Sequence, residues 1–302
     1  MTPKVIQVFD RSTGKAFAEK VFGDFAMRCA YGNKTGAWFS SKVLVRESVS
    51  QLMGAYYDSS LSKRQIAGFI REYDISVQDC EQHPESFSSF NEFFARHLKP
   101  SARPICEREN EIASPGDGRL LVFPQVDSST ITYAKWAPIR IGELFDGDEF
   151  LAQQFNGGAC AILRLCPSDY HRFHFPVTGT PAKSRDIKGV LHSVNPYALE
   201  NKIPVYCLNK RTLCKIETEN LGTVCYMEIG ALGVGSIVQT YEPNRQVIKG
   251  AEKGLFKFGG STVILFFERG KISFDQDLVN NSSQGFETLV RMGERIASRL
   301  AP

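Results

Sequence analysis

The sequence predicts an α+β fold, in which a helical N-terminal region is followed by a mainly antiparallel β domain with a C-terminal helix. Two observations carry this prediction. Up to about residue 100, apolar residues recur at the three- and four-residue spacing of amphipathic helices. From about residue 104, short apolar or alternating runs are separated by Gly, Pro, Asn and Asp, as in antiparallel sheets. We therefore place the helical region at residues 1–100 and the β-rich domain at residues 101–302.

The N-terminal region is expected to contain four helical stretches. Residues 15–31 place aromatic and aliphatic residues at helical spacing between basic side chains. Residues 49–57 repeat apolar residues at i, i+3, i+4, i+7 and i+8. Two sequences of the capping-box type begin at Ser62 and Ser89, and each precedes an apolar face. The helix after Ser62 is expected to end near Tyr73.

Six apolar or alternating runs are the expected strands of the β domain, since each has the length of a strand. They are residues 120–123, 159–165, 205–208, 224–229, 236–241 and 263–268. A final helix is expected over residues 284–300, where apolar residues again lie at helical spacing.

Charge and composition narrow the classes of function. The formal net charge of +3 is too small for nucleic-acid binding to be the main activity. None of the eight cysteines forms a Cys-x-x-Cys pair, so a structural zinc site is not expected. Reduced thiols fit a cytoplasmic protein best. No stretch of about 18 apolar residues predicts a helix that spans a membrane.

The first fifty residues differ in charge from the rest of the chain. They carry eight basic and four acidic side chains, a net charge of +4, while the remainder is close to neutral. Aromatic residues, including Trp38 and Phe39, are interleaved with the basic ones. Such a segment can lie in a membrane interface. Packing of an amphipathic helix on the protein itself is the alternative interpretation.

The segment that most strongly indicates catalytic chemistry is Gly259-Gly260-Ser261-Thr262, directly ahead of the apolar run 263–267. Two glycines allow backbone dihedral angles that a side chain would penalise. The Ser261 hydroxyl can therefore reach the carbonyl carbon of Gly260. Because a serine hydroxyl is a poor nucleophile near neutral pH, it needs a base that a carboxylate orients. A simple loop entering a strand is the other interpretation.

Three residues are candidates for the carboxylate and the base. Asp117 lies between glycines in a turn that begins with proline, and His171 and His174 are three residues apart. On a helical turn, this spacing puts both rings on one side, whereas on an extended strand the rings point to opposite faces. Asp117, His174 and Ser261 can form a triad, because such triads are defined by geometry. An Asx turn at Asp117 and an inert histidine pair are the alternatives.

Two further classes of function are alternatives to an enzyme with a serine nucleophile. Asp117, His171 and His174 are three N and O ligands, which would suit a catalytic zinc ion with an open position and hence a zinc-dependent hydrolase. A β-rich carrier or membrane-bound scaffold without enzymatic activity is the third class. Both leave the Gly-Gly-Ser-Thr sequence without a role.

Seven short segments match one known family in order and in spacing. They are residues 89–96, 103–105, 114–118, 170–174, 193–196, 234–237 and 254–262. Through these segments the chain resembles phosphatidylserine decarboxylase proenzymes of the bacterial type over nearly its whole length. The resemblance implies a self-processing enzyme whose cofactor is made from its own backbone.

The resemblance assigns the processing residues one by one. The family's triad falls on Asp117, His174 and Ser261, and the cleaved bond would be Gly260–Ser261. At one position this chain departs from the common pattern: many members have leucine where this chain has Gly259. The glycine variant is also found among relatives, so the resemblance still implies cleavage.

The resemblance also implies the catalytic group and the products. Residue 261 would become a covalent pyruvoyl group, which forms a Schiff base with the substrate amine. His171 matches a second family histidine, associated with the decarboxylation step, and Ser193 lies in a segment near the substrate. The products would be a large chain, 1–260, and a small chain, 261–302, which stay together as a heterodimer.

The implied activity is the decarboxylation of phosphatidylserine to phosphatidylethanolamine. Because this substrate is a lipid, the enzyme must meet a membrane, and the basic N-terminal segment is the expected contact. We therefore expect peripheral association with the cytoplasmic face of the cell membrane. No nucleic-acid partner is expected, and a homo-oligomer is compatible with the sequence.

Overall fold

The computed structural model describes residues 7–19, 47–127, 132–134, 137–194, 204–231, 236–259 and 261–300. The helices are α3 (Glu47–Asp58), η2 (Ser60–Gln65, a 3-10 helix), α4 (Ile66–Tyr73), α5 (Phe90–Phe94), α6 (Ile141–Leu144), α7 (Glu149–Gln154), α9 (Val205–Leu208) and α10 (Gln276–Ser283). The longer strands are β4 (Gly118–Phe123), β7 (Ala159–Leu165), β11 (Arg211–Thr218), β12 (Gly222–Gly230), β14 (Glu252–Phe256), β15 (Ser261–Phe267) and β18 (Arg295–Arg299). The shorter strands are β1 (Gln7–Asp10), β2 (Lys15–Ala18), β3 (Glu111–Ala113), β5 (Thr132–Ala134), β6 (Ala137–Ile139), β8 (Arg172–His174), β9 (Thr180–Pro181), β10 (Arg185–Ile187), β13 (Ile237–Gln239), β16 (Ile272–Phe274) and β17 (Glu287–Val290).

One large sheet organises the protein and runs in the order β10-β11-β12-β15-β7-β4-β17-β1-β2, with β9 beside β11. Its pairs are antiparallel except for β1 and β17, which run parallel. The strand β15 lies in the middle, between β12 and β7, and every one of its residues is buried. The apolar run that the sequence placed at 263–268 is therefore a strand of the core, as expected. The α+β class is confirmed.

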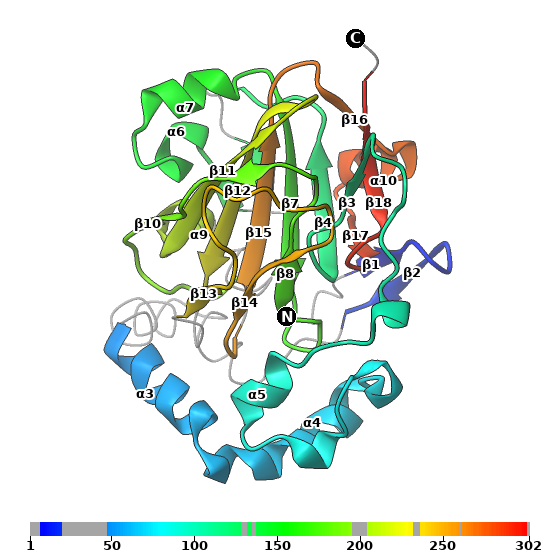
Figure 1. Ribbon diagram of the computed structural model, residues 1–302, viewed down its shortest axis with the longest axis vertical. Helices are drawn as coiled ribbons and strands as arrows, with labels where there is room; N and C mark the ends of the chain where they lie inside the picture. The colour runs from blue at the N-terminus through cyan, green and yellow to red at the C-terminus, as the bar shows by residue number, and fades with distance from the viewer. Residues whose placement is uncertain are drawn as a thin grey trace, which may run out of the picture.

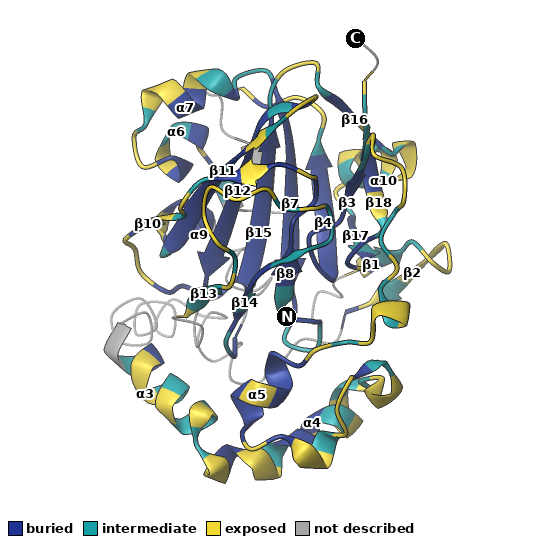
Figure 2. Ribbon diagram, in the orientation of Figure 1, coloured by how far each residue is buried: buried dark blue, intermediate teal, exposed yellow. Residues whose placement is uncertain are grey.

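Two apolar layers cover the large sheet, because alternate side chains of each strand point to opposite faces. Val263 and Leu265 belong to one core cluster, and Ile264 and Phe266 belong to the other. A small sheet, in the order β13-β14-β8, covers the first face, and the helices α6, α7 and α9 cover the second. Figure 2 shows the buried strands as the dark centre of the molecule.

The helices α3, α4 and α5 form an arc across the end of the sheet at which β15 begins (Figure 1). Their aromatic side chains make a separate cluster, which includes Phe69, Phe90 and Phe94 and also Phe258 from the β domain. The cap predicted at Ser89 is present, since its hydroxyl accepts the Glu92 N–H at 3.2 Å. The cap predicted at Ser62 is not: this buried hydroxyl donates to backbone carbonyl groups and accepts the Phe90 N–H instead.

Three local predictions were wrong. Residues 284–300 form β17 and β18, and the C-terminal helix lies earlier, at α10. Gly293 has a φ of 86°, so it turns the chain between the two strands where a helix would have continued. Residues 205–208 form a short helix, since a four-residue apolar run cannot be told from a strand by periodicity. Residues 15–18 form β2, which pairs with β1 around a turn at Gly14. For the histidine segment, where a helical turn and a strand were both open, residues 172–174 form the strand β8.

Several predictions fall outside the described residues. They concern most of the basic N-terminal segment, including Trp38 and Phe39, as well as Gly260 and the segments 195–196 and 232–235. The described part of residues 1–100 contains the helices expected at 49–57, after Ser62 and after Ser89, and also the hairpin of β1 and β2, which joins the large sheet. The division at residue 100 stays a prediction.

Candidate active site

Ser261 is the first residue of β15 and lies at the centre of the large sheet. It pairs with Gly230 of β12 on one side and with Leu165 of β7 on the other. Its side chain is fully buried, and its Oγ has no hydrogen-bond partner among the described residues. Burial of an unpaired hydroxyl costs about 1–3 kcal/mol, so such a group is unusual in a core and is often functional.

The backbone just before Ser261 has the freedom that the two glycines suggested. Gly259 has a φ of 139°, a value that residues with a side chain rarely adopt. The glycine that stands in place of the family's common leucine therefore suits the local conformation of this chain.

The helix α5 holds the segment that leads to Ser261. The Asn91 side chain accepts the Phe258 N–H at 2.7 Å, which fixes the backbone three residues ahead of Ser261. The Phe258 ring packs against Phe90, Phe94 and Tyr57, with centroid distances of 5.1, 5.1 and 4.2 Å. The N-terminal helices thus position the chain at the predicted cleavage point.

His171 lies against the same segment. Its Nδ1 donates to the Asp169 carbonyl at 3.0 Å, and its ring packs on Phe94 with a centroid distance of 3.9 Å. Burial lowers the pKa of His171 to about 3, although the backbone groups of Asp169 and Gly259 act in the opposite direction. The ring is therefore neutral at pH 7. Its buried Nε2 has no hydrogen-bond partner of ordinary geometry among the described residues.

His174 is the last residue of the extended strand β8 and has different partners from His171. The His174 Nδ1 donates to the Gly250 carbonyl at 2.9 Å, and Nε2 accepts the Tyr170 hydroxyl at 3.2 Å. Burial lowers the pKa of His174 as well. The spacing of the two histidines on one helical turn, which the sequence allowed, is not what forms.

Asp117 lies close to β8, but its carboxylate is engaged elsewhere. The turn that carries it contacts the strand, since the His174 N–H donates to the Pro115 carbonyl at 2.7 Å. The carboxylate accepts two hydrogen bonds from Arg103, at 2.8 and 2.6 Å, and one from the Met292 N–H. Within the described residues no hydrogen bond joins Asp117 to His174 or His174 to Ser261. The triad of Asp117, His174 and Ser261 stays a prediction.

Tyr170 and Arg103, which hold His174 and Asp117 in place, were not among the predicted site residues. Both lie inside segments that match the family, and this position in the sequence could have indicated that they belong to the site. Ser193 is buried, and its predicted contact with substrate is not tested by the structure. The zinc alternative is not supported: across the described parts of the chain, no group of three His, Cys, Asp or Glu side chains could hold a metal ion.

A buried network of charges lies behind His171. Arg119 contacts Asp169, whose carbonyl holds the His171 ring, at 2.6 Å. Glu19, at the end of the N-terminal hairpin, makes ion pairs with Arg119 and Arg164 at 2.6 and 2.9 Å. Burial alone would raise the pKa of Glu19, but Arg164 and Arg119 outweigh it and hold the pKa at about 2. The N-terminal hairpin is thus tied electrostatically to the site.

Because the pKa of Glu19 is lower in the folded state, its charge stabilises the fold above the ordinary pKa of about 4.5, and this stabilisation is lost as the pH falls towards 2. We expect Glu19→Gln to lower the free energy of unfolding most at pH 7. The difference from the parent should shrink by about 3 kcal/mol between pH 5 and pH 2. Urea titrations of both proteins at several pH values measure it. A difference that is constant with pH would contradict the ion pairs.

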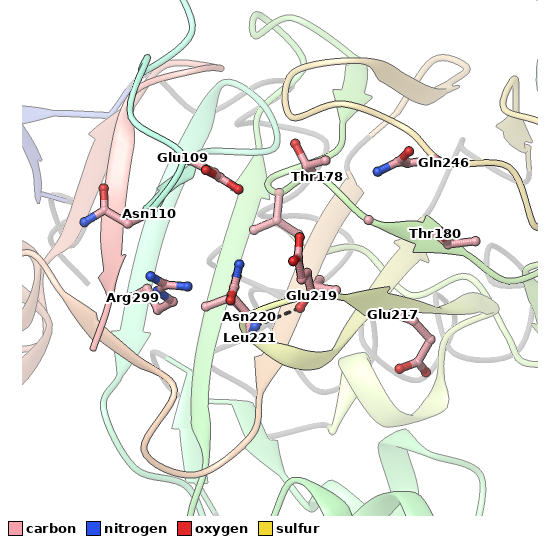
Figure 3. Close-up of a pocket in the computed structure, with 13 residues that line it drawn as sticks. Glu109, Asn110, Thr178, Thr180, Glu217, Glu219, Asn220, Leu221, Gln246 and Arg299 are labelled. Atoms are coloured by element: carbon pink, nitrogen blue, oxygen red, sulfur yellow. Dashed lines mark hydrogen bonds between the residues drawn. The ribbon is translucent and has the colours of Figure 1, made fainter. Parts of the chain in front are cut away.

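A larger cavity, of about 440 Å³, lies away from these residues. Figure 3 shows Glu109, Glu217, Glu219 and Arg299 around it, near the turn between β11 and β12. None of the predicted site residues lines it. Its size therefore does not make it the active site.

Comparison with known proteins identifies the family. The model of the phosphatidylserine decarboxylase family matches residues 90–298. A phosphatidylserine decarboxylase proenzyme of Clostridium perfringens is 44% identical over 295 residues, 98% of this chain and 100% of the relative. Proteins of the same name from Ruminiclostridium cellulolyticum and Clostridium botulinum are each 43% identical, over 97% and 98% of this chain and 98% and 100% of their own lengths. This chain belongs to the phosphatidylserine decarboxylase family.

Proposed function

We propose that this protein cleaves itself at Gly260–Ser261 and then decarboxylates phosphatidylserine to phosphatidylethanolamine. Similarity over the full length to proteins named as proenzymes of this activity supports the reaction and the processing. The observation that carries the cleavage site is the buried, unpaired hydroxyl of Ser261 behind a glycine with a φ of 139°. The direct test is release of CO2 from phosphatidylserine vesicles, with loss of activity after treatment with hydroxylamine, which traps carbonyl groups.

Maturation would use only groups of the chain. His174, oriented by Asp117, takes the Ser261 hydroxyl proton, and Oγ attacks the Gly260 carbonyl carbon, so that an ester C–O bond replaces the peptide C–N bond. Elimination removes the Cα proton of residue 261 and releases the Gly260 carboxylate, which leaves dehydroalanine. Addition of one water to the imine tautomer releases ammonia and leaves the ketone of a pyruvoyl group.

The surroundings of residue 261 fit a group formed in place, since its side chain is enclosed and has no competing partner among the described residues. A pyruvoyl group supplies an electron sink for the carbanion formed when CO2 departs, as pyridoxal phosphate does in other enzymes. His171 is neutral at pH 7, so it must take up a proton before it can give one to carbon. Phe94 packs on its ring, with a centroid distance of 3.9 Å.

Alanine variants of the two histidines separate their roles. We expect His174→Ala to remain one uncut chain, because the processing base is lost. We expect His171→Ala to be cut but to decarboxylate about 10²–10⁴-fold more slowly, the usual cost of losing a proton-transfer group. Intact-mass measurement and CO2 release provide the two readouts. Cutting in the first variant and none in the second would move the base role to His171, whose Nε2 has no hydrogen-bond partner among the described residues.

Peripheral membrane contact is the second part of the proposal. Within the described residues, no helix is long and apolar enough to cross a membrane. Leu52 in α3 and Leu61 in η2 are 75% and 65% exposed. They would extend the basic N-terminal segment with apolar side chains that a bilayer interface can bury. The cytoplasmic face is the proposed side.

Replacing Leu52 and Leu61 together by serine should weaken binding to phosphatidylserine vesicles at least tenfold, since each buried leucine contributes about 1.5–3 kcal/mol. Co-sedimentation measures the bound fraction. Phe150→Ser is the matched control, because Phe150 is equally exposed, at 75%, but lies in α7. Truncation of residues 1–45 would be a poor test, because it removes β1, β2 and Glu19. Unchanged binding of the double variant would contradict this contact.

A further inference from the structure

A cavity of about 220 Å³ lies beside the candidate site, where the N-terminal helices meet the turn of Asp117. Asp117, Asp169 and Tyr170 line it, and so do Arg96 and Ser168. It is smaller than a usual pocket for a drug-sized ligand, so it has room for a small polar group and not for an acyl chain. We call it the Arg96 cavity.

Arg96 is the unusual residue in its wall. The residue is only 4% exposed, yet no carboxylate lies within 4 Å of its guanidinium among the described residues. Its Nη1 makes a long contact of 3.5 Å to the Phe93 carbonyl, its Nε has no partner, and the neutral thiol of Cys80 is nearby. The guanidinium lies over the Phe93 ring, 5.0 Å from its centroid, and Asp117 and Asp169 attract it from beyond 4 Å, so this buried cation has no carboxylate in direct contact.

The acidic residues of the cavity are already engaged or exposed. Asp117 is bound by Arg103, and Asp169 is bound by Arg119. Asp79 lies 3.7 Å from Arg103, and Asp74 is exposed at the rim. Arg96 therefore has no anion in direct contact among the described residues.

We propose that Arg96 binds the phosphate group of the phosphatidylserine headgroup, an assignment that rests on the proposed function. A guanidinium presents a planar pair of donors that matches two phosphate oxygens, and the Ser168 hydroxyl lies in the same wall. The carboxylate of the substrate fits less well. It is lost in the reaction, and an ion pair with it would stabilise the substrate more than the transition state. The phosphate is unchanged, so binding it tethers the substrate without opposing the reaction.

Binding can be tested without turnover, in the full-length Ser261→Ala protein. The probes are glycerophosphoserine, inorganic phosphate and serine, and the readout is the shift in melting temperature. Glycerophosphoserine should raise the melting temperature more than phosphate does, and serine should leave it unchanged. Adding Arg96→Met should abolish the shift and leave the ligand-free melting temperature equal or higher, because it removes a buried charge that has no carboxylate in direct contact. Arg71→Met, on the exposed face of α4, is the matched control and should keep the shift.

Kinetics of the processed enzyme give the second test. Arg96→Met should raise the KM for phosphatidylserine at least tenfold and change kcat less than twofold, and Arg96→Lys should recover part of the KM. Equal ligand shifts in the Arg96→Met and parent proteins, a lower ligand-free melting temperature of that variant, or a loss confined to kcat would overturn the assignment. If the wild type is not cut or does not release CO2, the proposed function fails. The melting-temperature experiment on the Ser261→Ala protein still tests whether Arg96 binds an anion.

Discussion

Replacing Ser261 by alanine is expected to leave one polypeptide of 33.7 kDa, where the wild type gives the chains 1–260 and 261–302. The variant lacks the only atom that can attack the Gly260 carbonyl carbon in the proposed maturation. It should also lack a carbonyl group that reacts with hydroxylamine, and it should release no detectable CO2 from phosphatidylserine. Intact-mass measurement beside the wild type checks the first point, and the labelling and activity assays check the others.

Thr262→Ala is the matched control for this experiment. Thr262 is the next residue of β15, is equally buried, and also has an Oγ1 without a partner among the described residues. Its side chain points to the opposite face of the sheet, away from β8 and the histidines. The control should be cut as the wild type is. A wild type that turns over phosphatidylserine as a single uncut chain would refute the proposed processing.

The second large effect is expected at Arg164, in β7. Its guanidinium donates to both oxygens of Glu287, at 2.9 and 2.7 Å, and to Glu19 at 2.9 Å, and its side chain is 3% exposed. Arg164→Met removes the cation that pairs with Glu287 and one of the two that pair with Glu19, so buried negative charge is left without compensation. Breaking a buried pair in this way costs about 3–5 kcal/mol, a large part of the 5–15 kcal/mol that stabilises a typical domain. Urea unfolding in the Ser261→Ala background measures the loss.

A paired variant keeps this prediction testable if Arg164→Met does not fold. Arg164→Met combined with Glu287→Met removes the second charge, so that Glu19 retains Arg119 and Asp169 retains the same partner. Most of the lost free energy of unfolding should return, because apolar side chains of similar volume often replace a buried ion pair at little cost. A single variant as stable as its parent would mean that the network contributes nothing.

The sequence predicted the elements whose periodicity was long and unambiguous. The helices α3 and α4 and the strands β4, β7, β12 and β15 lie where their apolar patterns put them. It failed where tertiary pairing decided the outcome. Residues 287–290 have apolar spacing compatible with a helix, yet they fill the place between β4 and β1 in the large sheet. The isolated Gly293 was the local signal against one continuous helix.

Only part of the candidate site could be predicted from the sequence, for a similar reason. Ser261 could be found because chemistry and backbone freedom coincide in four consecutive residues. The partners of each charged group could not be found, since they come from distant parts of the chain. Asp117 meets Arg103, and Arg164 meets Glu19 across 145 positions of sequence. No periodicity links such residues, and only the folded sheet brings them together.

The order of strands in the large sheet has a consequence for the lifetime of the cut protein. The small product would supply β15 and β17, while β7 and β4, which lie between them, belong to the large product. Strands of the two products therefore alternate within one sheet, and neither product can dissociate unless the hydrogen bonds between these strands break. To refold, a denatured mature enzyme would have to reassemble this strand order from two separate chains. Its survival should thus depend on how slowly it unfolds and not on a reversible equilibrium.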